Sequence, residues 1–251
     1  MRGLLLVGSV LLFAAVSGCA HYRTPGGGVS IPAITDSNIA EALARQPAAQ
    51  FPAHVIVARV QASGYVSTSG RGYGTGRFSV LTTRDIETEE DFELLASLPG
   101  IAGVGPLNRI LLPANLQSTQ ELREAAAQLH GDIVLLYTLD TAFHTESQLV
   151  APLQLVSLGI FASEKSRIVT TCAAAFIDVR TGYVYGVAEG SATDTRRSSV
   201  WTTEDAIDRA RLKTEREAFS AALNEIAKAW SSINTEYNVT TAAADPRSDR
   251  R

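Results

Sequence analysis

The segment Asp132 to Leu139 (DIVLLYTL) constrains the fold most, because it is almost continuously apolar over the length of one strand. Such a run is typical of a buried parallel strand whose two faces are both covered. Before it, Ser118 to His130 carries apolar residues on one helical face and begins with Ser118 and Glu121 at capping-box spacing. With a strand predicted at Leu107 to Leu112, these segments form a right-handed βαβ unit.

Further segments extend this unit into a mixed sheet. Ala53 to Ala62 is apolar on both faces, as in a central strand. Ile168 to Asp178 and Tyr183 to Ala192 flank the turn Val179 to Gly182 and predict an antiparallel hairpin. An apolar stripe predicts a last helix over Thr203 to Ile233 that packs on the sheet. The fold class is therefore α/β (α+β): a single domain with a mixed sheet, a βαβ unit, an antiparallel hairpin and a long C-terminal helix.

The composition supports one globular unit. Of the 251 residues, 45% are hydrophobic and 19% are charged, which excludes a disordered chain, a collagen-like repeat and a disulfide scaffold. Lys and Arg number 22 against 26 Asp and Glu, so the formal net charge is -4. This mildly acidic balance argues against nucleic acid as a partner.

The N-terminus reads as a secretory signal over residues 1–18. A basic start at Arg2 precedes an apolar stretch from Leu4 to Val16 and the small residues Ser17 and Gly18. This stretch is shorter than the roughly 20 residues that a membrane-spanning helix needs. We therefore expect the segment to be removed rather than to remain as a transmembrane helix.

Val16-Ser17-Gly18-Cys19 resembles the lipobox of bacterial lipoproteins. The resemblance implies that diacylglycerol is attached to the Cys19 thiol and that Cys19 becomes the mature N-terminus. The alternative is a plain secretory signal with an incidental cysteine. Two or more acyl chains anchor a protein stably at a bilayer surface. Ala20, in place of Asp, implies by the same resemblance a lipid anchor in the outer membrane, with the domain on the periplasmic face.

The mature chain divides into three parts. Residues 19–50 are expected to form the lipidated N-terminus and a flexible tether, because they are rich in Gly and Pro. Residues 51–233 form the periplasmic α/β domain, and residues 234–251 a disordered C-terminal tail. If Cys19 is a thioether, Cys172 has no intramolecular disulfide partner, so packing must supply the stability.

Two stretches resemble the core of the CsgG curli-secretion lipoproteins. They are Gly131 to Leu135 after an alanine-rich helix, and Phe176 to Tyr185 (FIDVRTGYVY) at the end of a long strand. The layout also resembles the N-terminal domain of TolB. CsgG-type pore formers add two membrane-crossing hairpins to this fold, and Ser147 to Ser163 is the candidate insertion. The alternatives for this stretch are a segment packed on the domain's own core and a patch that touches membrane or another subunit.

The glycine series Gly70 to Gly76 alternates with larger residues and opens a strand. We expect either a mobile loop or a loop that contacts a partner or a glycan, since Tyr and Arg are favoured at interfaces. The candidate contact residues are Tyr65, Arg71, Tyr73 and Arg77.

Four charged residues are predicted within or beside buried strands: Arg59, Arg109, Asp132 and Asp140. Buried charges must be paired, so these residues are expected to form ion pairs that fix the strand order. The alternative is a ligand crevice at the carboxyl ends of the strands, built from Asp140, Thr141 and His144.

The sequence offers no catalytic residues. Its four histidines lack metal-ligand spacing, and no nucleophile elbow, Walker loop or dinucleotide fingerprint occurs. We expect no metal and no cofactor. The predicted function is that of a membrane-anchored envelope lipoprotein acting as a non-enzymatic assembly or interaction module. The alternative is a subunit of a CsgG-like ring-shaped secretion or pore complex. Expected partners are the membrane, through acyl chains on Cys19, and envelope proteins, with self-association as an open alternative.

Overall fold

A mixed six-stranded sheet forms the centre of the computed structural model, which describes residues 27–31, 39–146, 165–197 and 204–243. Its strands are β1 (Ala53–Ala62), β3 (Phe78–Leu81), β4 (Ile101–Pro106), β6 (Ile133–Glu146), β7 (Lys165–Asp178) and β8 (Val184–Arg197). Two short strands, β2 (Thr75–Gly76) and β5 (Asn115–Leu116), form a separate parallel pair. The predicted fold class is confirmed.

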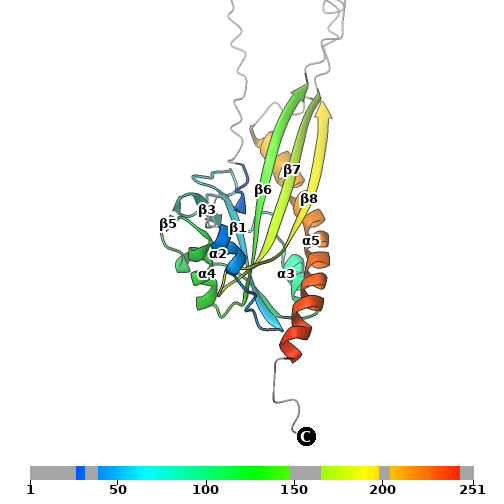
Figure 1. Ribbon diagram of the computed structural model, residues 1–251. Helices are drawn as coiled ribbons and strands as arrows, with labels where there is room; N and C mark the ends of the chain where they lie inside the picture. The colour runs from blue at the N-terminus through cyan, green and yellow to red at the C-terminus, as the bar shows by residue number, and fades with distance from the viewer. Residues whose placement is uncertain (1–26, 32–38, 147–164, 198–203, 244–251) are drawn as a thin grey trace, which may run out of the picture.

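β1 lies in the middle of the sheet, with β6 on one side and β4 and β3 sharing the other. β4 pairs in parallel with the first half of β1, and β3 pairs antiparallel with its second half. β6 is parallel to β1, β7 is antiparallel to β6, and β8 is antiparallel to β7. The order is therefore β3 and β4, then β1, β6, β7 and β8 (Figure 1).

The βαβ unit is present, but its first strand was predicted at the wrong place. It runs from β4 through α4 (Thr119–Gln128) to β6. Leu107 to Leu112 instead contains the 3-10 helix η1 (Arg109–Leu111), because the Asn108 side chain caps the turn by accepting from the Ile110 N–H at 3.0 Å. β4 (IAGVGP) gives a weak strand pattern, since glycine and proline are depleted in strands.

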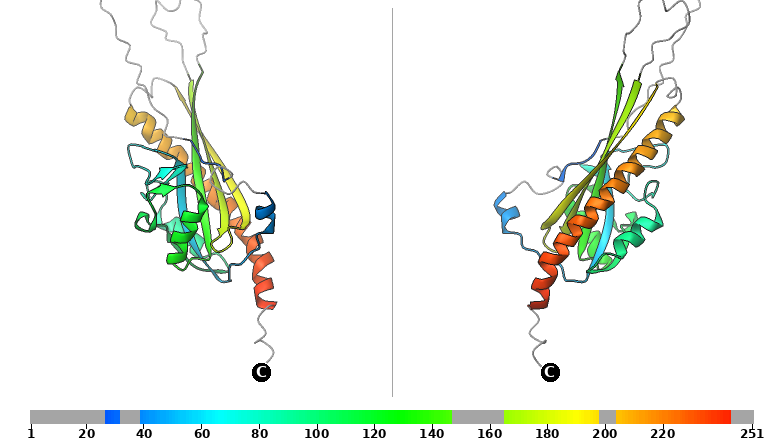
Figure 2. Two further views of the ribbon diagram at one scale, coloured as in Figure 1. Left: turned by 60° about the vertical axis from the view of Figure 1, so that its left-hand side comes forward. Right: turned by 90° about the vertical axis from the view of Figure 1, so that its right-hand side faces the viewer.

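Helices cover both faces of the sheet. The long helix α5 (Glu204–Ala243) and α3 (Glu89–Ala96) pack on one face, and α4 packs on the other with the η1 loop. Figure 2 shows α5 lying obliquely across its face of the sheet. Trp230 of α5 is fully buried, contacts the Phe176 ring and donates from its indole N–H to the Pro99 carbonyl at 2.8 Å. The two-layered core explains why β1 and β6 are apolar on both faces.

The end of the last helix was predicted too early. α5 continues past Ile233 to Ala243, so residues 234–243 are not a disordered tail. Tyr237 explains the extension, because its ring packs edge-on against Tyr183 and Tyr185 of the β7–β8 hairpin. These contacts hold an additional helical turn against the domain. Residues 244–251 lie outside the described part of the chain.

Two parts of the predicted tether lie on the domain. The Val29 N–H donates to Thr138 Oγ1 at 3.1 Å, which holds residues 27–31 across β6. Ala48 N–H donates to Asp178 at 2.7 Å, and Ala49 N–H donates to the Tyr185 hydroxyl at 3.0 Å. The expectation of a free tether is therefore wrong for these segments. Between them, the short helix α2 (Ile39–Ala44) has no buried residue.

β6, β7 and β8 each have 14 residues and extend beyond the other strands (Figure 1). Their far ends are in register, with Glu146 opposite Lys165 and Lys165 opposite Arg197. The candidate insertion Ser147 to Ser163, like Cys19 and the signal segment, lies outside the described residues. Among the helices described, none is both long and apolar enough to cross a membrane.

Candidate interaction site

The outer edge of the sheet is open along β8. Within the described residues β8 pairs with β7 alone, so its other edge presents unpaired backbone N–H and C=O groups. α5 covers one face of the strand. On β8, Val187 is 66% exposed and Val184 is 40% exposed. A long open edge that carries exposed apolar residues is a ready surface for pairing with another chain.

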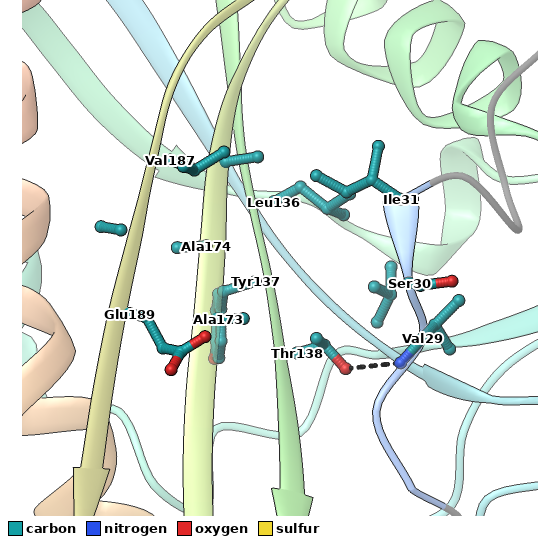
Figure 3. Close-up of a pocket in the computed structure, with 13 residues that line it drawn as sticks. Val29, Ser30, Ile31, Leu136, Tyr137, Thr138, Ala173, Ala174, Val187 and Glu189 are labelled. Carbon is teal, nitrogen blue, oxygen red and sulfur yellow. Dashed lines mark hydrogen bonds between the residues drawn. The ribbon is translucent and has the colours of Figure 1, made fainter.

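An apolar pocket of about 400 Å³ adjoins this edge. It lies between the segment Val29 to Ile31 and the three strands β6, β7 and β8 (Figure 3). The small side chains Ala173 and Ala175 of β7 leave room for it, since Ala175 lies opposite the larger Leu136 and Val187 of the neighbouring strands, while the Ala174 side chain belongs to the core on the α5 face. The full lining is Val29, Ser30, Ile31, Val60, Leu136, Tyr137, Thr138, Ala173, Ala174, Ala175, Val187, Ala188 and Glu189.

The chemistry of this pocket suits apolar groups. Among its lining residues Glu189 is the sole charged one, and Thr138 already accepts the hydrogen bond from Val29. An extended peptide paired with β8 would bring alternate side chains next to Val187, at the margin of the pocket, since side chains alternate between the faces of a strand. The open edge and the pocket together form one surface, called the β8 surface below.

The structure brings only some of the predicted contact residues together: Arg71 and Tyr73 line one pocket, whereas Tyr65 is buried. Tyr65 is 2% exposed, and its hydroxyl accepts from Arg211 Nη1 at 3.3 Å. Burial raises its pKa, with the Glu215 carboxylate as a further cause. Its side chain is therefore not at the surface. Arg71 and Arg77 are exposed, whereas Tyr73 is half-buried.

The predicted ion pairs have other partners. Arg59 is buried, as expected, but it pairs with Asp85 at 2.5 Å and with Glu215 at 3.4 Å. Arg109 is exposed in η1 instead of buried in a strand. Asp132 accepts from the His54 backbone N–H at 2.9 Å, and Asp140 is exposed in β6. The strand order is therefore not fixed by pairs among the four charges that the sequence singled out.

The predicted crevice does not form at Asp140 and Thr141. Adjacent strand residues point to opposite faces, and here Asp140 is exposed while Thr141 is buried under α5. The Thr141 hydroxyl donates to Glu215 Oε1 at 3.1 Å, so the final helix covers it. β6 also continues to Glu146 instead of ending near Asp140. The side chain of His144 lies outside the described part of the chain.

Sequence reasoning missed the buried charges of α5. Charged helix residues usually face solvent, but Asp208, Arg211 and Glu215 are each at most 5% exposed. Arg211 pairs with Asp208 at 2.9 Å and with Glu215 at 2.7 Å. A signal was present, because Arg211, Thr214, Glu215 and Ala218 follow the helical spacing of the buried stripe.

The β7–β8 turn is as predicted. Asp178 Oδ1 accepts from the backbone N–H groups of Arg180 and Thr181 at 2.8 and 2.9 Å, and Gly182 has a φ of 71°. Cys172 is a free, buried residue of β7. In the described residues, no group of three His, Cys, Asp or Glu side chains is placed to hold a metal ion.

No family model and no curated protein matches the chain. A variant PelC dodecamer from Paraburkholderia phytofirmans is 18% identical, with 75% of this chain and 93% of that chain covered and a TM-score of 0.30. Lipoprotein GNA1162 from Neisseria meningitidis is 15% identical, with 70% and 99% covered and a TM-score of 0.36. Both scores lie below 0.5, so the likeness to CsgG and TolB remains a prediction from the sequence.

Proposed function

We propose that the chain is a membrane-anchored envelope lipoprotein that acts as a non-enzymatic assembly module and joins another protein molecule at the β8 surface. The observation that carries this proposal is the open edge of a 14-residue strand beside an apolar pocket of about 400 Å³. Proteins normally shorten, charge or cover such an edge to prevent unwanted pairing. The first part of β8, from Val184 to Ala188, carries no charged side chain and exposes Val187, so this part of the edge favours a specific partner.

Binding would use the backbone and the pocket for different purposes. Hydrogen bonds from an added strand to β8 supply affinity without regard to sequence, and apolar side chains over Val187 and the β7 alanines supply selectivity. Burying one leucine-sized side chain is worth about 1.5–3 kcal/mol. Because Glu189 lies at the pocket, a basic residue in the partner would add a charge-assisted contact.

The lipobox supports the anchoring part of the proposal. Acyl chains on Cys19 would hold the domain at the periplasmic face of the outer membrane. A Cys19→Ala variant is expected to move from the membrane fraction to the soluble fraction of the cell envelope. Mass spectrometry of the mature N-terminus checks the same point, because it reports acylated Cys19 directly. An unmodified chain cleaved elsewhere would contradict the anchor.

Site-specific photocrosslinking tests the β8 surface. A benzoylphenylalanine in place of Val187 is expected to give a discrete covalent adduct in intact cells. The matched control carries the same group in place of Ile110, which is 84% exposed on η1, on the α4 side of the sheet. An adduct at both positions, or at neither, would overturn the proposal. Mass spectrometry of the adduct tells whether the partner is a different protein or a second copy.

A ring subunit is the second candidate, and the sheet's two unlike edges favour it. β8 forms one edge, while β3 and β4 form the other. If β8 of one copy contacts a different surface of the next, the interface is heterologous, and such contacts form a ring when the rotation between copies closes. Light scattering of the lipidated chain in detergent would give one closed oligomer for the ring and a monomer for an adaptor. Val187→Lys would dissociate the ring, whereas Ile110→Lys would not.

A further inference from the structure

A second pocket lies at the opposite edge of the sheet from β8. It has a volume of about 340 Å³ and is lined by Arg71, Gly72, Tyr73, Gly74, Thr75, Arg109 and Ala114. Its two walls are the loop that follows β1, which ends at Ala62, and the loop that follows β4, which ends at Pro106. These two strands are parallel neighbours. The carboxyl ends of parallel strands are where sheets of this type bind ligands.

The wall formed by Arg71 to Thr75 is held rigidly in place. Tyr73 exchanges two backbone hydrogen bonds with Val80 at 2.8 and 2.9 Å, and its hydroxyl donates to the Leu112 carbonyl at 3.1 Å. Thr75 N–H donates to the Ala114 carbonyl at 2.7 Å, which joins the two loops. Gly74 has a φ of 92°, and a Cβ there would lie 2.5 Å from Leu116. The pocket is therefore preformed, and the glycines serve close packing instead of mobility.

Two arginines at this pocket have no partner within the described part of the chain. Arg71 and Arg109 are both exposed, and neither makes an ion pair or a side-chain hydrogen bond there. No carboxylate lines the pocket. Two guanidinium groups at one concave surface of a chain with net charge -4 form a local positive site. Such a site attracts an anionic group that can accept from both arginines.

Beside the arginines, the lining consists of Thr75 and mostly apolar residues. The half-buried Tyr73, Ala114 and the two glycines give a surface suited to the C–H face of a sugar ring. We propose that this pocket binds an anionic saccharide, in which the sugar ring packs on Tyr73 and a carboxylate or phosphate substituent is bound by Arg71 and Arg109. A simple anion such as inorganic phosphate would contact the arginines but not Tyr73. The assignment is independent of the β8 surface.

Titration calorimetry of the full lipidated chain in a non-ionic polyoxyethylene detergent tests the assignment. The probes are trigalacturonate and glucose 6-phosphate, with neutral maltotriose and inorganic phosphate for comparison. At least one of the two anionic sugars is expected to bind more tightly than maltotriose and than phosphate. Arg71→Gln and Arg109→Gln should each weaken that binding about tenfold.

Arg180→Gln is the matched control, because it removes the same charge from an exposed position in the β7–β8 turn. It should leave the affinity unchanged. The proposal is overturned if neither anionic sugar binds, or if inorganic phosphate binds as tightly as the sugars. An equal loss of affinity in Arg180→Gln would also overturn it, since the effect would then reflect overall charge. Tyr73→Leu should weaken binding of the sugars but not of inorganic phosphate.

Discussion

Arg59 of β1 and Glu215 of α5 form an ion pair between the sheet and the last helix, with 3.4 Å between Nη2 and Oε2. Both side chains are at most 3% exposed. The same carboxylate accepts from Arg211 at 2.7 Å and from the Thr141 hydroxyl at 3.1 Å. Because every member is buried, this network fixes α5 in one position along β1 and β6.

Removing the charge of Glu215 should therefore be costly. Glu215→Gln removes the carboxylate that Arg59 and Arg211 share, although Asp85 and Asp208 still pair with them, and losing hydrogen bonds to a buried charged group costs about 1.5–3 kcal/mol. Urea denaturation followed by circular dichroism measures the free energy of unfolding. The control is Glu217→Gln, whose side chain is 46% exposed and pairs with Lys213 at the surface. It should cost less than about 1 kcal/mol. Equal effects would show that the network adds nothing.

Gly190 of β8 permits close approach of α5. A Cβ at this position would lie 2.2 Å from the backbone nitrogen of Ala222, which cannot move without displacing the helix. Gly190→Ala should lower the free energy of unfolding by about 1–3 kcal/mol. In Gly186→Ala the new methyl group lies 3.3 Å from the end of the Ile233 side chain, which can adjust. A similar loss for both variants in urea denaturation would contradict this account.

Glu87 should make the stability depend on pH. Burial raises the pKa of its carboxyl, although Arg59 acts to lower it, and the Tyr137 hydroxyl donates to it. The folded state thus holds the proton more tightly than the unfolded state. The stabilisation that Glu87 contributes is fully present below about pH 4.3, the pKa of a glutamate in the unfolded chain. It is lost as the pH rises through the higher pKa that Glu87 has in the folded state.

Glu87→Gln removes this dependence because the amide does not titrate. Relative to the original chain, the variant should become more stable as the pH is raised from about 4 to neutrality. Urea denaturation at the two pH values measures the difference. Glu124→Gln, at an exposed helical position, provides the comparison. A stability difference for Glu87→Gln that does not change with pH would show that the carboxyl titrates normally.

Cys172 should resist thiol reagents in the folded protein. Burial raises the pKa of its thiol to about 12, and the reactive species is the thiolate. Iodoacetamide at pH 8 is expected to leave the lipidated chain unlabelled and to add one label after unfolding in concentrated urea, since the proposed acylation would block Cys19 as a thioether. Intact-mass measurement counts the labels. Labelling of the folded chain as fast as a cysteine peptide would show that the strand opens readily.

Local patterns predicted the elements that depend on neighbours in the chain. β1 has the predicted bounds, Ala53 to Ala62, because two-sided apolar character is visible in the sequence itself. The capping box at Ser118 and Glu121 begins α4 as expected, with Ser118 N–H donating to the Glu121 carboxylate at 2.9 Å. The turn that follows Asp178 was also predicted, because it depends on hydrogen bonds between residues that are close in the sequence. β4 was missed because its glycines conceal a strand that is stabilised by pairing with β1.

The sequence by itself determined the two-sided central strands, the capped helix α4 and the long helix that packs on the sheet, because apolar periodicity and capping are local properties. Only the tertiary structure decided which charges are buried and which surfaces stay open. Arg59 is paired by Asp85 and Glu215 because folding brings β1, a loop and α5 together. The pocket beside Val187 likewise exists because Val29 crosses β6, far along the chain. Which residues pair with a buried charge, and which sheet edges stay open, depend on contacts between segments that are far apart in the chain. Hydrophobic periodicity does not encode these contacts.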